Sequence, residues 1–290
     1  MSTSKSRAVS QAMATSRGHQ VWRWLRLAFC AVMLGLILAP LLWTVFLSLR
    51  DNVDLMRQAP LNLLGPYTLA NYGELLKSQM LFRWFFNSML VSGVSVLGVL
   101  TLSSLAGYAF GRLHFPWRNW LYAFVLMGLA IPDQSVILTR HHIFSSLHWH
   151  NSYLALILPG LSAPLGVFLM TETFRAIPKG MEDAARLDRA SSFGIFWRIL
   201  LPQTLPAQAS LGIYTFLLSW NDYWWPLISA TRPDMYTLTE GMAAAQTNYA
   251  EITGMGVLMA EAVLAGLPVL IIYMAFQKHI VRAITGMVKL

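Results

Sequence analysis

The chain has 290 residues, of which 56% are hydrophobic and 12% are charged. A water-soluble domain could not bury so much apolar side chain, so the composition excludes one and predicts an all-α membrane protein with several spans. The formal net charge is +8, and the basic residues lie beside the ends of apolar runs rather than on one continuous basic surface. That distribution argues against a nucleic-acid partner and favours contact with membrane lipid.

Both ends of the chain are basic. Residues 1–26 form a tail without an acid, whose cations are Lys5, Arg7, Arg17, Arg23 and Arg26. The C-terminal stretch also lacks an acid and carries Lys278, Arg282 and Lys289. The positive-inside rule therefore predicts that both termini are cytoplasmic. Residues 1–20 show no apolar period, so we expect them to be disordered.

Residues 27–290 are predicted to form one transmembrane domain with six spans. The apolar runs lie at residues 27–47, 85–110, 120–138, 153–174, 207–227 and 255–276. The first run is too long for the apolar part of a signal peptide, which predicts an uncleaved anchor. The second is rich in Gly, Ser and Ala, and we expect it to be central because small residues let membrane helices approach closely. Pro132 and Asp133 interrupt the third run, where we expect a kink and a capped or snorkelling carboxylate.

A charged loop at residues 175–205 separates the fourth and fifth runs. Glu182 and Asp183 follow the breaker Pro178–Gly180, and acids there complement the free N–H groups of a helix N-terminus. A second, amphipathic piece, Phe193–Leu201, is expected to stop at Pro202. Taken alone, these features also fit an ordinary cytoplasmic helix with a solvated face.

The spacing within this loop resembles the EAA loop of ATP-binding-cassette (ABC) importer permeases. The match consists of Asp183-Ala184-Ala185, position 189 and Ile199–Pro202. These positions have the same spacing as in the family's pattern, with no insertion or deletion between them. Asp183 replaces the family's Glu, and Arg189 replaces a Gly that would allow a positive-φ turn. Either the turn is made differently here or Arg189 has a local partner such as Asp188. In the family this loop is a coupling helix on the ATPase, which implies docking by Glu182, Asp183, Ala184, Ala185, Asp188 and Arg189.

Two further motifs resemble the carbohydrate-uptake branch of these permeases, of the maltose-transporter type. One pattern is matched by Trp220, Asn221, Tyr223, Trp225, Pro226 and Leu227, and Asn87-Ser88 is another match. The ending Gln277–Lys289 matches more weakly, at Gln277 and Val281 directly and at Gly286 and Lys289 after a one-residue deletion. The resemblance covers about residues 67–289.

The resemblance implies a permease subunit that forms half of a sugar pathway across the bacterial inner membrane. Its expected partners are two cytoplasmic ATP-binding subunits, a second homologous permease subunit and an extracytoplasmic solute-binding protein, which the outer loop at residues 228–254 would contact. The chain has no phosphate-binding Gly-x-x-x-x-Gly-Lys motif and no Gly-Lys pair. We therefore expect no cofactor on this chain, with ATP and Mg on the ATPase subunit.

Candidates for the solute path are Trp220, Asn221 and Tyr223, from the resemblance, and Glu261. Glu261 is a carboxylate well inside the sixth apolar run, where a charged group by default faces the protein interior or a wet cavity. It either lines the path and binds sugar hydroxyls or pairs with a polar group on another helix. The sequence does not identify the solute.

Two other readings compete with an importer subunit. A stand-alone, ion-coupled secondary transporter would need titratable groups within the membrane, for which only Glu261 and Asp133 qualify. A membrane-embedded enzyme would use the histidines at positions 141, 142, 148 and 150. No carboxylate or cysteine joins these histidines, so we predict no metal site there, and we expect the single cysteine, Cys30, to be a small packing residue.

Overall fold

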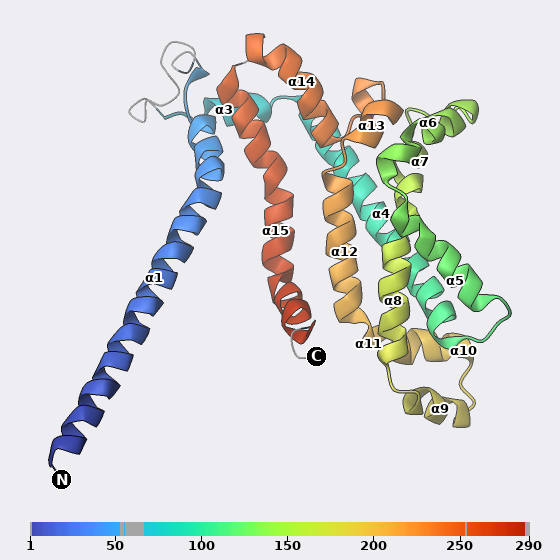
Figure 1. Ribbon diagram of the computed structural model, residues 1–290. Helices are drawn as coiled ribbons and strands as arrows, with labels where there is room; N and C mark the ends of the chain where they lie inside the picture. Colours follow the sequence, from blue (N-terminus) through green and yellow to red (C-terminus); the bar gives the residue numbers. More distant parts are fainter. Residues whose placement is uncertain (1, 53–54, 56–66, 253, 288–290) are drawn as a thin grey trace.

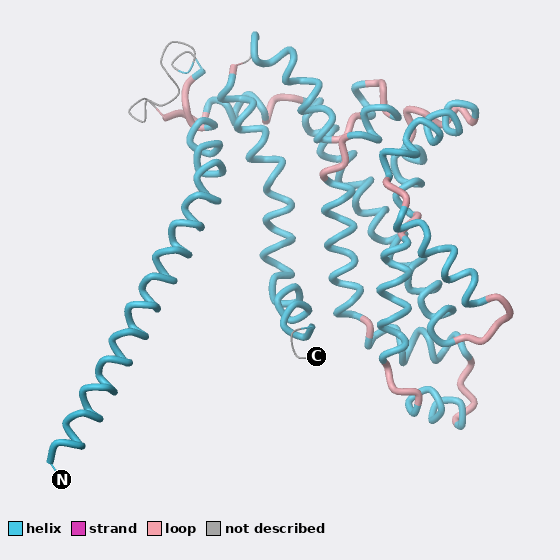
Figure 2. The backbone as a smooth tube through the Cα atoms, in the orientation of Figure 1, coloured by secondary structure: helices cyan, strands magenta, loops and turns pink. Residues whose placement is uncertain are grey.

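The computed structural model describes residues 2–52, 55, 67–252 and 254–287, and within these ranges the chain is almost wholly helical. One isolated bridge between Arg50 and Tyr67 is the single β-type pairing of this part of the chain. The helices run mostly along one direction and form a bundle with two ends (Figures 1 and 2). We call these the α9 end and the α14 end, after the helices that lie there.

The long helices of the bundle are joined by short helical pieces. In chain order the α-helices are α1 (Ser2–Ser48), α3 (Ala70–Leu75), α4 (Gln79–Arg112), α5 (Arg118–Met127), α6 (Ile137–Ser146), α7 (Tyr153–Ile157), α8 (Pro164–Ala176), α9 (Gly180–Leu187), α10 (Ser192–Gly194), α11 (Leu201–Gln203), α12 (Leu205–Trp220), α13 (Trp224–Ser229), α14 (Leu238–Ile252) and α15 (Met255–Met287). Short 3₁₀ pieces occupy Gly128–Ala130, Asp133–Val136, Leu158–Leu161 and Pro233–Met235, and a π-helical piece occupies Ile195–Leu200.

Helix α4 is the centre of the bundle, as its small residues predict. It packs along both α8 and α12. A Cβ atom added to Gly107 would lie 2.6 Å from Cβ of Met170 and 2.8 Å from the Met170 carbonyl carbon. Only a residue without a side chain lets α4 and α8 approach so closely.

The structure supports several of the six predicted spans as apolar helices. Three helices of the described chain are long and apolar enough to cross a membrane, Trp22–Ser48, Gln79–Arg112 and Met255–Gln277. Two bent pairs, Arg118–Ala130 with Asp133–Ser146 and Tyr153–Leu161 with Pro164–Ala176, raise the count to five if each is one span. The expected span at residues 207–227 is interrupted, because α12 ends at Trp220 after 16 residues and α13 begins at Trp224. The structure thus supports several apolar helices and does not establish six spans.

The third apolar run bends more sharply than a kinked span. Its two halves meet at 94°, and the break falls between Ala130 and Asp133, where Pro132 cannot continue the helix. The Asp133 carboxylate forms an ion pair with the Arg140 guanidinium one helix further on. The expected kink is therefore present, and the carboxylate is satisfied by a cation.

The N-terminal tail differs from our expectation of disorder, because α1 runs without a break from Ser2 to Ser48. The tail is rich in Ser, Ala and Gln, and its Ala and Gln residues propagate a helix readily once the apolar segment has nucleated it. Residues 22–42 of this helix are all exposed, and α1 stands apart from the bundle until it meets α15 near the α14 end (Figure 1).

Candidate functional site

Helix α9 has the turn that the glycine-containing pattern requires, although the residue in that turn is an arginine. Arg189 has φ of 57°, in the left-handed region. Its N–H donates to the Arg186 carbonyl at 3.0 Å, and the Ala190 N–H donates to the Ala185 carbonyl at 3.0 Å. These two bonds form the Schellman motif that ends many helices. Arg189 therefore makes the same kind of positive-φ turn as the glycine of the family's pattern. No ion pair between Arg189 and Asp188 is found in the described chain.

Burial divides the docking candidates on α9 into two faces. Glu182 and Ala185 are buried, with 7% and 8% of their surface exposed. The Glu182 Oε1 atom accepts a hydrogen bond from Arg186 Nη2 at 2.8 Å, and this bond raises the pKa of the Arg186 guanidinium above its usual value. The exposed residues are Asp183, Ala184, Asp188 and Arg189.

Sequence reasoning missed Leu187, which also belongs to the exposed face of α9. Its side chain is 86% exposed, the largest value among the apolar side chains recorded as exposed. Single exposed apolar side chains are common on protein surfaces, so this exposure shows only that Leu187 is accessible to a partner. The sequence signal for its exposure was its position between the charged residues Arg186 and Asp188.

The second piece of the loop is amphipathic, as predicted, but it does not stop at Pro202. Ile195, Phe196 and Leu200 are buried, whereas Phe193 and Trp197 are exposed. Helical structure continues to Gln203 because Pro202 occupies the first turn of α11, where a helix does not need its N–H. The break comes instead at Thr204, before α12.

The loop is attached to the bundle through α4 and α8. The Tyr108 hydroxyl donates to the Ser192 carbonyl at 3.3 Å, and Arg112 Nη2 donates to the Ile177 carbonyl. The ring of Tyr108 lies 5.0 Å from that of Phe196 and 5.9 Å from that of Phe174. A displacement of the loop would therefore act directly on the end of α4.

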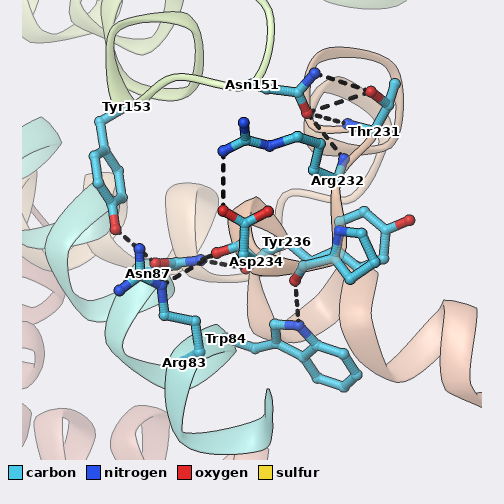
Figure 3. Close-up of polar contacts among 10 residues, drawn as sticks. Arg83, Trp84, Asn87, Asn151, Tyr153, Thr231, Arg232, Asp234 and Tyr236 are labelled. Atoms are coloured by element: carbon cyan, nitrogen blue, oxygen red, sulfur yellow. Dashed lines mark hydrogen bonds and ion pairs between the residues drawn. The ribbon is translucent and has the colours of Figure 1, made fainter.

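The other end of α4 holds the segment between α13 and α14, as Figure 3 shows. Asn87 is fully buried, and its Nδ2 atom donates to the carbonyls of Asp234 at 3.0 Å and Tyr236 at 2.8 Å. Its Oδ1 atom accepts from the Tyr153 hydroxyl at 2.7 Å. One buried amide therefore joins α4, α7 and the segment before α14.

Three more side chains form hydrogen bonds with the same segment. Trp84 Nε1 donates to the Pro233 carbonyl at 2.8 Å, and Ser88 Oγ accepts from the Leu238 N–H at 2.8 Å. Asn151 Oδ1 accepts from the N–H groups of Thr231 at 2.7 Å and Arg232 at 2.9 Å (Figure 3). We call Trp84, Asn87, Ser88 and Asn151 the clamp. The sequence singled out Asn87 and Ser88 as a motif match but gave them no role.

The path candidates are placed separately. Trp220 is buried, stacks on Phe216 at 5.4 Å and donates from Nε1 to the Ala265 carbonyl of α15 at 3.1 Å. Asn221 is exposed and bonds its own helix at the Leu217 carbonyl. Glu261 is 2% exposed, and its Oε2 atom has no hydrogen-bond partner. Tyr223 is half-buried and packs against Trp224.

The histidines do not converge on one point. The rings of His141 and His150 lie 4.7 Å apart, whereas His142 and His148 are exposed. Over the part of the chain that the structure describes, no group of three or more His, Cys, Asp or Glu side chains is placed to hold a metal ion.

Comparisons with known proteins identify the family to which the chain belongs. The family model described as "Binding-protein-dependent transport system inner membrane component" matches residues 100–286. The arabinooligosaccharides transport system permease protein AraQ of Halalkalibacterium halodurans is 33% identical over 265 residues, covering 90% of this chain and 94% of that protein. The diacetylchitobiose uptake system permease protein NgcG of Streptomyces coelicolor is 27% identical, covering 86% of this chain and 83% of that protein.

The fold is shared with a solved transporter. The crystal structure of a bacterial ABC transporter involved in the import of the acidic polysaccharide alginate has a chain that superposes with a TM-score of 0.78 at 17% identity. The match covers 90% of this chain and 97% of that one. Because the family model spans more than half of its length, the chain belongs to the inner membrane components of binding-protein-dependent transport systems.

Proposed function

We propose that this chain is the permease subunit of an ABC importer in which the exposed face of α9 is the attachment point of the ATPase. The observation that carries the proposal is the combination of Asp183, Ala184 and Leu187, exposed at one end of the bundle, with the firm attachment of the loop to α4. A small, flat patch beside a carboxylate and a free apolar side chain is suited to insertion into a groove of another protein. Glu182 and Ala185 instead support the helix from within.

Membership of the family excludes the two rival readings, because its members are subunits of systems that include a binding protein. The chain is a transport subunit rather than an enzyme. ATP and Mg belong, in this proposal, to two ATP-binding subunits on the cytoplasmic side, and a second permease subunit completes the pathway. The start of α1 and the end of α15 lie toward the same end as α9 (Figure 1), which supports a cytoplasmic location for all three.

The mechanism that this arrangement supports is alternating access. Closure of the ATPase subunits would displace α9, and the bonds from Tyr108 and Arg112 would pass the displacement to α4. At its other end α4 carries the clamp, so the segment before α14 would move with it. We propose that this segment and α14 face the extracytoplasmic binding protein.

The solute is proposed to be a carbohydrate, in the size range of oligosaccharides. The support is that AraQ and NgcG are named for the transport of arabinooligosaccharides and diacetylchitobiose. Glu261, Trp220, Asn221 and Tyr223 remain the path candidates. The Oε2 atom of Glu261 is buried without a hydrogen-bond partner, and we propose that alternating access exposes it to a sugar hydroxyl. Glu261→Gln should therefore lower uptake while leaving the complex assembled.

The proposal is tested by extracting the chain from its native membrane in mild detergent and identifying the proteins that accompany it. The wild type is compared with Asp183→Lys and with the matched charge reversal Glu74→Lys, an exposed residue of α3 near the α14 end. The wild type and the control should retain an ATPase and a second permease, and Asp183→Lys should lose the ATPase alone. If the chain purifies by itself in all three cases, the proposal fails.

A further inference from the structure

A cavity of about 550 Å³ opens beside α9, between the ends of α4 and α8 and the start of α5. Its lining is strongly basic, with the cations Arg112, Arg118, Arg175, Lys179 and Arg186. Two carboxylates, Glu182 and Asp183, also line it, so cations outnumber acids by five to two. Neither the docking role of α9 nor the solute pathway accounts for this surplus.

Ion pairs within the chain neutralise only part of the positive charge of this cavity. Arg175 pairs with Glu172 at 2.8 Å, and Arg186 pairs with Glu182 at 2.8 Å. Among the described residues, no carboxylate forms an ion pair with Arg112, Arg118 or Lys179. Arg118 donates from Nη1 to the Leu113 carbonyl at 3.0 Å, which fixes its guanidinium without neutralising it.

Arg112 lies at the buried edge of the cavity, and among the described residues it has no carboxylate partner. The residue is only 7% exposed, and its Nη2 atom donates to the Ile177 carbonyl. Its Nε atom is buried and has no hydrogen-bond partner. A buried guanidinium without a carboxylate partner is costly, and an oxyanion in the cavity would offset its charge.

The neighbouring surface indicates where such an anion would come from. A second hollow of about 330 Å³ shares Arg118 and His114 with the cavity and is lined by Phe115, Trp117 and Trp120. Trp117 and Trp120 are each 75% exposed. Exposed tryptophans beside basic residues mark the level of lipid headgroups at a membrane interface.

We propose that this cavity binds the phosphate group of an anionic phospholipid. The phosphate would lie between Lys179 at the entry to α9 and Arg118 at the start of α5, and its negative charge would offset the positive charge of Arg112. The acyl chains would leave along the hollow of Trp117 and Trp120. The inference rests on the proposed function in one respect, since it takes the α9 end to face the cytoplasmic leaflet, where anionic lipids are attracted to basic segments.

The test measures lipid retention on the purified full-length chain by native mass spectrometry. Equal amounts of phosphatidylglycerol and phosphatidylcholine with the same acyl chains are offered in detergent. The double variant Arg118→Gln/Lys179→Gln removes two cavity cations. The matched control Arg189→Gln/Arg198→Gln removes two exposed cations from the same end of the molecule without touching the cavity lining.

The wild type and the control should retain phosphatidylglycerol in preference to phosphatidylcholine. The double variant should lose that preference by about thirtyfold, because each basic side chain near an anionic headgroup strengthens binding by roughly fivefold. Lys179→Gln alone should lose part of the lipid preference. Because Lys179 is exposed, this single variant also controls for a folding defect in the double variant. An unchanged preference in both cavity variants would overturn the proposal.

Two other occupants would give different results. If inorganic phosphate alone stabilises the wild type against heat but not the double variant, and no lipid preference exists, the site takes a soluble phosphate and the lipid proposal is wrong. If the double variant keeps its lipid preference but loses the ATPase on extraction, the cations serve protein docking, which also overturns it. Because retention is measured without partners, its failure is distinct from a failure of α9 to bind an ATPase.

Discussion

The two ends of α4 hold their attached segments in opposite ways. At the α14 end, the clamp binds residues 231–238 through the buried Trp84, Asn87 and Ser88 and the half-buried Asn151. Asn87 alone makes three hydrogen bonds there. At the α9 end, α9 keeps most of its residues exposed, and Arg189, in the turn after it, has a strained conformation. A segment fixed by many buried bonds moves with the helix that holds it, whereas an exposed helix is available to a partner. The difference suggests that force enters at α9 and is delivered at the clamp.

The largest expected effect comes from breaking the clamp. Asn87→Leu would leave the carbonyls of Asp234 and Tyr236 and the Tyr153 hydroxyl without their partner. We expect a loss of on the order of 3 kcal/mol, or a fall in Tm of roughly 6–12 °C, in detergent. The control is Asn119→Leu, at an exposed position of α5. A similar Tm for both variants would mean that the clamp does not fix the segment.

A pH-dependent effect should be confined to the α14 end. Glu240 in α14 is 2% exposed, and burial raises the pKa of its carboxyl from 4.5 to about 8. The folded chain therefore holds this proton more tightly than the unfolded chain. Its contribution to stability is complete below pH 4.5 and is lost as the pH rises toward about 8.

The measurement is Tm as a function of pH for the wild type and for Glu240→Gln, which cannot ionise. The wild type should lose stability between about pH 5 and 8, by less than the ~1.4 kcal/mol per pH unit that a single proton allows. The variant should show a flatter profile over the same range. Parallel profiles would contradict the assignment of this titration to Glu240.

A smaller effect is expected at the α9 end, where a substitution should stabilise the folded chain rather than destabilise it. Arg189→Gly should stabilise the chain by about 1 kcal/mol, because a residue with a Cβ atom is penalised in the left-handed conformation. Arg198→Gly, within the π-helical piece, should instead destabilise by a similar amount, since glycine weakens a helix interior. Thermal unfolding of the two variants compares them directly. Destabilisation by Arg189→Gly would show that the arginine side chain makes a contact worth more than the strain.

The sequence predicted what depends on neighbours in the chain. The start of α9 and the break at Pro132 follow from a few consecutive residues, whereas the positive φ of Arg189 was left open by the sequence. The clamp could not be predicted, because the Trp84, Asn87 and Ser88 bonds to residues 233–238 join positions 147 to 150 apart in the chain. A polar Asn87 within an apolar run was the one available signal. The helical tail and the interrupted span at Trp220 depend on how far a helix propagates, which composition does not fix.

The central claim, that the exposed face of α9 meets the ATPase, is tested most directly by photo-cross-linking. A benzophenone amino acid is placed at Leu187, which is 86% exposed on α9, or at Asn119, an exposed control at the same end on α5. Irradiation of native membranes should cross-link position 187 to an ATP-binding subunit and leave position 119 free of that product. No ATPase product at position 187, or equal yields at both positions, would contradict the account.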